Sequence, residues 1–71
     1  MIFMQLKRIR IYNEEGKSLF CMSDCRLEVY EGCAFIYYTD ENGAPAYPGP
    51  HKRVSVFPLN KISSMECYEK D

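Results

Sequence analysis

The sequence predicts an all-β protein: a small antiparallel five- to six-stranded barrel or strongly bent sheet (meander), with little or no helix. Three observations support this. Short segments rich in β-branched and aromatic residues alternate with turn formers, no segment has the apolar period of a helix, and a hydrophobic fraction of 46% is too high for a disordered chain. With 71 residues, we predict a single small β domain over 1–71, with a Pro/Gly-rich loop at 40–51. The expected strands are 4–12, 17–22, 25–30, 33–39, 52–57 and 64–68.

The first expected strand breaks strict alternation. Met4 and Leu6 fall on one side of a regular strand, whereas Ile9 and Ile11 fall on the other. A β-bulge near Lys7 and Arg8 would bring these apolar residues to one side and would bend the strand. The alternative is that both sides are partly buried.

Ser23 and Asp24 predict a turn between the second and third strands. If the turn has two residues, Cys21 and Cys25 face opposite sides of the sheet. A three-residue turn would place the two thiols directly opposite one another.

Glu31 and Gly32 predict a two-residue hairpin turn. This register pairs Val29 with Ala34 and Leu27 with Ile36, and period-two alternation then assigns the two sides of the sheet. One side carries Cys25, Leu27, Val29, Ala34, Ile36 and Tyr38; the other carries Arg26, Glu28, Tyr30, Cys33, Phe35 and Tyr37. The second side is too aromatic to face only water, so we expect a further element or another protein to cover it.

Toward the C-terminus, we expect Val54 and Val56 to point inward and Arg53, Ser55 and Phe57 to point outward. Pro58 ends that strand because it lacks the N–H of a sheet residue. Residues 58–62 predict a turn, such as one 3₁₀ turn, in which Leu59 and Ile62 cap the open end of the core. Met65 and Cys67 then return to the inward side.

Composition argues against catalysis. His51 is the sole histidine, and the sequence has no phosphate-binding glycine loop, so we expect no enzyme, no catalytic residue and no cofactor. The spacing of Cys21 and Cys25 lies within the range used by zinc ligands, but Cys33 and Cys67 form no second pair. We therefore expect buried apolar thiols and no metal. A cysteine metal or redox site is the second alternative function.

The loop at 40–51 is the first candidate binding segment. Pro45, Pro48 and Pro50 stiffen it, Tyr47 provides an aromatic anchor, and His51, Lys52 and Arg53 provide charge. Together with the aromatic side chains of the sheet, the predicted partner-binding residues are Tyr30, Phe35, Tyr37, Tyr47, His51, Lys52 and Arg53. The alternatives are a tip with no role, or a hairpin extended through Asn42 and Gly43.

These features predict a non-catalytic protein-interaction module: a small accessory or regulatory protein that self-associates, by default as a homodimer, and/or binds a larger protein partner. The first alternative is a nucleic-acid-binding barrel. Its basic stripe would contain Lys7, Arg8, Arg10, Lys52 and Arg53, provided that strands 4–12 and 52–57 are neighbours. A formal net charge of -1 argues against it. We expect no membrane partner, and a cytoplasmic location because the short apolar N-terminus precedes its basic residues instead of following them.

Overall fold

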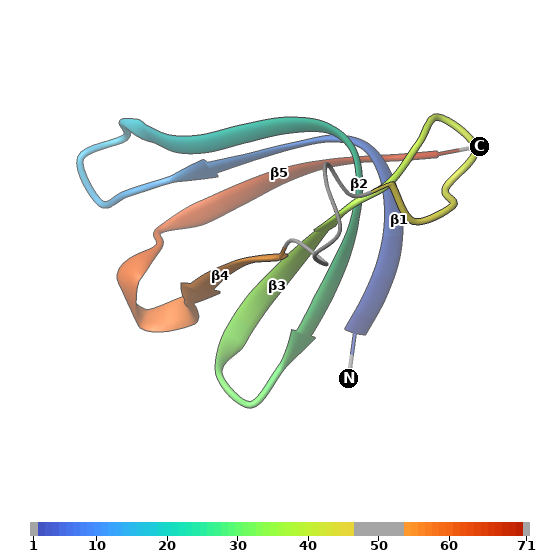
Figure 1. The fold of residues 1–71 in the computed structure, drawn as a ribbon. Coiled ribbons are helices and arrows are strands. Elements are labelled where there is room, and N and C mark those ends of the chain that lie inside the picture. Colours follow the sequence, from blue (N-terminus) through green and yellow to red (C-terminus); the bar gives the residue numbers. More distant parts are fainter. Residues whose placement is uncertain (1, 47–53, 71) are drawn as a thin grey trace.

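The computed structural model describes residues 2–46 and 54–70 (Figure 1). It contains five strands and one short 3₁₀ helix. These elements are β1 (Ile2–Tyr12), β2 (Ser18–Tyr30), β3 (Cys33–Tyr38), β4 (Val54–Pro58), η1 (Leu59–Lys61) and β5 (Ser64–Glu69).

All neighbouring strands are antiparallel, and the sheet order is β4-β3-β2-β1-β5. The first four strands form a meander, and β5 returns to pair with the opposite side of β1. β4 and β5 therefore lie at the two ends of the sheet, and η1 connects them. The chain forms a bent, unclosed sheet, which confirms the predicted fold class.

A coupled irregularity in β1 and β2 produces the bend. Leu6 pairs with Cys25 and Arg8 pairs with Ser23, so the register of β1 against β2 is kept while Lys7 and Asp24 fall out of the alternation. Against β5, the register shifts between Leu6 and Arg8. This confirms the predicted bulge. The predicted turn at Ser23 and Asp24 is wrong, because Asp24 takes a φ of 51° and bends one continuous strand without reversing it.

The bend divides the sheet into two wings, which Figure 1 shows as β1 and β2 change direction together. Wing A contains β3, β4, residues 25–30 of β2 and residues 2–6 of β1; wing B contains β5, residues 18–23 of β2 and residues 8–12 of β1. The core lies inside the bend, and its fully buried residues are Leu6, Ile9, Ile11, Cys25, Leu27, Ala34 and Ile36.

Aromatic side chains of the two wings meet across the core, and residues at η1 and in β5 pack against it. The rings of Phe20 in wing B and Phe57 in wing A lie 5.2 Å apart. Leu59 and Ile62, at η1, pack against the core, as do Met65 and Cys67 of β5. The predicted 3₁₀ turn with an apolar cap is therefore confirmed.

The hairpin at Glu31 and Gly32 has the predicted register, with Val29 opposite Ala34 and Leu27 opposite Ile36. Both turn residues have positive φ, 51° and 74°, as a type I′ turn requires.

Sequence reasoning assigned the sides of β4 incorrectly. Phe57 pairs with Ala34 and packs against the core, whereas Val54 and Val56 lie on the outer side. The register against β3 decides this, because residues paired across neighbouring strands share one side of the sheet.

The described part of the predicted loop at 40–51, residues 40–46, contains a tight turn. Asp40 and Ala44 close a tight turn through a backbone bond of 2.8 Å, Thr39 bridges to Pro45, and the Ala46 N–H donates to the Tyr38 carbonyl. This is the hairpin through Asn42 and Gly43 that the sequence offered as an alternative.

Candidate functional site

The outer side of wing A carries a cluster of aromatic and aliphatic side chains, which we call the aromatic face. Strand pairing arranges it in two rows. One row runs Val56, Phe35, Glu28, Phe3, and the next runs Val54, Tyr37, Arg26. Tyr30 lies beside Phe35 and completes the face.

Stacking orders the centre of the aromatic face. The rings of Tyr30 and Phe35 lie 4.5 Å apart at an interplanar angle of 16°. The Arg26 guanidinium lies 5.5 Å from the centroid of Phe3 and 4.8 Å from that of Tyr37. Such cation–π contacts attract a guanidinium to the faces of the rings.

The charges on this face cancel. Arg26 Nη2 lies 2.8 Å from Glu28 Oε2, and both side chains are mostly buried, with 27% and 14% exposure. Burial is the main cause that raises the pKa of Tyr37 above its ordinary value, and the nearby Glu28 carboxylate raises this pKa further. The face is thus partly desolvated and has no uncompensated charge among these residues.

Its margins remain open to solvent. Phe3 is 51% exposed, Val54 39% and Val56 47%, whereas Tyr30, Phe35 and Tyr37 are half-buried. Large apolar side chains exposed together, and not singly, are typical of interaction surfaces.

The structure brings together three of the predicted binding residues: Tyr30, Phe35 and Tyr37. Sequence reasoning missed Phe3, Arg26, Val54 and Val56 as members of this site. The hairpin register contained the signal for Arg26, which it places opposite Tyr37. The other predicted residues, Tyr47, His51, Lys52 and Arg53, lie outside the described residues, so their role stays a prediction.

The basic stripe of the nucleic-acid alternative does not form as expected. It required the strand after Lys52 and Arg53 to lie beside β1, but β3 and β2 separate β4 from β1. Arg8 lies over the Tyr68 ring at 5.0 Å. Hydrogen bonding with Tyr12, and then with Cys21, raises the pKa of Arg10. Lys7 is exposed on the bulge.

Glu66 supplies the matching negative charge in wing B. Its carboxylate accepts hydrogen bonds from the Tyr12 hydroxyl and from the Tyr68 hydroxyl, the latter at 3.3 Å. The bond from Tyr12 is the main cause that lowers the pKa of Glu66. The guanidinium groups of Arg8 and Arg10 thus lie among tyrosines and a carboxylate of the same chain.

The four cysteines are free thiols in different surroundings. Cys25 is buried, and this burial raises its pKa to about 11; burial also raises the pKa of Cys67. Cys33 is half-buried. Cys21 is exposed, so the expectation of buried thiols is wrong for that residue, which pairs with Arg10 on the outer side. Cys21 and Cys25 face opposite sides because the bend at Asp24 lies between them.

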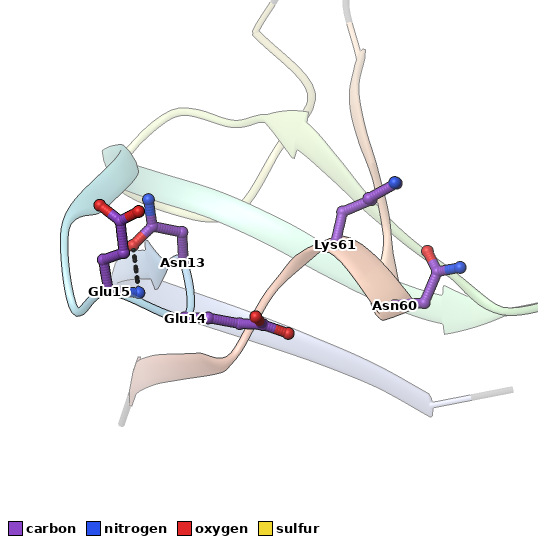
Figure 2. Close-up of a pocket in the computed structure, with 5 residues that line it drawn as sticks. All are labelled: Asn13, Glu14, Glu15, Asn60 and Lys61. Carbon is purple, nitrogen blue, oxygen red and sulfur yellow. Dashed lines mark hydrogen bonds between the residues drawn. The ribbon is translucent and has the colours of Figure 1, made fainter.

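Within 2–46 and 54–70, no group of three or more His, Cys, Asp and Glu side chains lies close enough to hold a metal ion. A polar hollow of about 360 Å³ lies between the turn at 13–17 and η1. Figure 2 shows its lining residues, Asn13, Glu14, Glu15, Asn60 and Lys61. The Asn13 side chain is already used, since its Oδ1 accepts the N–H groups of Glu15 and Lys17.

No helix in the described part of the chain is long and apolar enough to cross a membrane. Comparison with protein-family models, with curated proteins and with solved structures finds no match.

Proposed function

We propose that this protein is a non-catalytic protein-interaction module that docks another protein chain through its aromatic face, as a small accessory or regulatory protein. The observation that carries the proposal is the exposure of Phe3, Val54 and Val56 around the half-buried stack of Tyr30 and Phe35. The core lies on the other side of the same sheet, so these side chains are not needed to fill it.

The chemistry of the face favours a protein over a nucleic acid. Its single guanidinium is paired with Glu28 and lies over the rings of Phe3 and Tyr37, so it offers no free cation to a phosphate. Aromatic residues and arginine are the side chains most enriched at the centres of protein interfaces. A standard interface buries about 800 Å² per partner.

Site-specific photo-crosslinking tests the proposal. A benzophenone amino acid replaces Phe3 in one variant and Leu19 in a matched control, because Leu19 is similarly exposed (47%) but lies in wing B. Each variant is expressed at its natural level in the cells that carry the gene, and adducts are identified by mass spectrometry.

We expect a discrete protein adduct from position 3 and none from position 19. Adducts of equal yield from both positions, or none from position 3, would contradict docking through the aromatic face. An adduct that nuclease removes would favour the nucleic-acid alternative instead.

A further inference from the structure

Among residues 2–46 and 54–70, no strand pairs with the outer edge of β4, which adjoins the aromatic face, and the backbone of β4 has a defined orientation. The Leu59 N–H donates to the Gly32 carbonyl at 2.8 Å, which continues the β3–β4 register beyond the pair of Cys33 and Pro58. Bonded and non-bonded pairs alternate in an antiparallel ladder. Phe57 and Ser55 therefore direct their N–H and C=O groups toward β3, whereas Val54 and Val56 direct theirs toward the free edge.

The described residues of this edge, those of β4, carry little of the usual protection against pairing. Natural edge strands carry lysines, inward charges or prolines that prevent another strand from adding. β4 (Val54–Pro58) has no charged residue, and its one proline lies at the C-terminal end, beyond the two valines. Val54 and Val56 also present exposed apolar side chains on the outer side.

We infer that a second copy of this chain occupies this edge, with β4 pairing antiparallel to β4 of the other copy about a twofold axis at Ser55. Val54 of one copy then exchanges both backbone hydrogen bonds with Val56 of the other, and Pro58, which has no N–H to donate, lies outside the paired residues. This inference goes beyond the proposed function, because pairing along the β4 edge extends the sheet beside the aromatic face and leaves Phe3, on β1, uncovered.

The register is self-complementary on both sides of the sheet. On the outer side, the valines of the two copies form one apolar strip, flanked on each side by Phe35 and Tyr37. On the inner side, Ser55 lies opposite Ser55 of the second copy, and serine pairs across strands can hydrogen-bond. The paired charges of Arg26 and Glu28, and a formal net charge of only -1, present little repulsion between copies.

Sedimentation equilibrium of the full chain over a wide concentration range tests the inference. We expect a reversible dimer in the natural sequence. Val56→Pro removes an edge-directed N–H from each copy and is expected to weaken the dimer by about tenfold or more. Val56→Thr, which has nearly the same shape and keeps the N–H, is the matched control and should stay within about threefold of the natural chain.

A second experiment tests the register and does not depend on whether Val56→Pro folds. Residues in a non-bonded antiparallel pair have Cα atoms about 4.5 Å apart, which suits a disulfide. In a Cys21→Ala background, Ser55→Cys is expected to give a covalent dimer on mild oxidation. Ser64→Cys, at an exposed serine of β5, should give little.

A monomer at every concentration, or a dimer that Val56→Pro leaves unchanged while Ser55→Cys does not cross-link, would overturn the inference. The crosslinking at Phe3 tests the proposed function separately, because β3 and β2 lie between β4 and β1 and place Phe3 away from the paired edge. An adduct from position 3 would therefore retain the aromatic face as a docking surface even if the pairing of the β4 edges fails.

Discussion

At the residue scale, the four thiols provide a direct probe of the fold. Cys21 is exposed and Cys25 is buried, although only three residues separate them. The thiolate is the reactive form, and burial raises the pKa of Cys25 to about 11.

In a titration with a thiol reagent near pH 8, we expect Cys21 to react first and Cys25 to react only on unfolding. Cys21→Ala should remove the fast phase alone. A fast phase that persists in Cys21→Ala would contradict the placement of the two cysteines.

The same pKa predicts a pH dependence of stability. Because the pKa of Cys25 is higher in the folded chain than its ordinary value of 9.0, the folded state holds this proton more tightly. The contribution is fully present below pH 9 and is lost as the pH rises toward 11. Chemical denaturation across this range should therefore show a falling free energy of unfolding, with a shallower decline in Cys25→Ala than in the natural chain.

The contact between Arg26 and Glu28 makes a further prediction at this scale. Arg26→Met leaves a carboxylate that is 14% exposed without its partner, and we expect this to cost about 1–3 kcal/mol of unfolding free energy. Adding Glu28→Gln should restore part of the loss. A double-mutant cycle in urea measures the coupling, and a coupling near zero would mean that the pair is fully screened by water.

At the scale of the element, Asp24 is the residue on which the bend of β2 depends. Its φ of 51° is unfavourable for most side chains but is tolerated by Asp, Asn and Gly. Its Oδ1 also lies 3.1 Å from Lys70 Nζ. Asp24→Val should therefore destabilise the chain by about 2 kcal/mol or more, whereas Asp24→Asn should cost less than about 1 kcal/mol. Thermal or urea unfolding of the two variants checks this order.

The elements also show how far the sequence could predict this structure. The Glu31–Gly32 hairpin was predictable in full, because a two-residue turn and period-two alternation leave a single register. The role of Asp24 was not predictable, because a turn-forming residue between two apolar segments gives the same sequence pattern whether the chain reverses there or only bends. The sides of β4 were missed because two valines resemble a core pattern until the strand is paired with β3.

The candidate site was partly predictable for the same reasons. Tyr30, Phe35 and Tyr37 follow from the hairpin alone, whereas the exposed valines depend on the long-range pairing of β3 with β4. Phe3 was missed because it lies just before the start of the predicted first strand, although β1 begins at Ile2. Its contact with Arg26 depends on the pairing of β1 with β2.

At the scale of the whole molecule, the fold depends on contacts between the wings. Phe57 reaches Phe20 across the core, and the sheet itself is not closed by hydrogen bonds between β4 and β5. Phe57→Ala should therefore lower the unfolding free energy by about 2–3 kcal/mol. Leu19→Ala, which removes an exposed side chain of wing B, should change it by less than about 0.5 kcal/mol. Equal losses in the two variants would contradict the packing of the wings.

Lys7 and Asp24 interrupt the regular pairing of β1 with β2 at the same position along the two strands. The other residues would take the same sides of the sheet without them. If both codons were deleted together, β1 and β2 would stay in step, and every apolar residue that now points inward would still share one side. What would vanish is the curvature. The polypeptide would become a flatter ribbon with perfect polar–apolar alternation and no interior, prone to stacking on its neighbours. In this protein, the two residues that break the polar–apolar alternation are the ones that bend the sheet around its core.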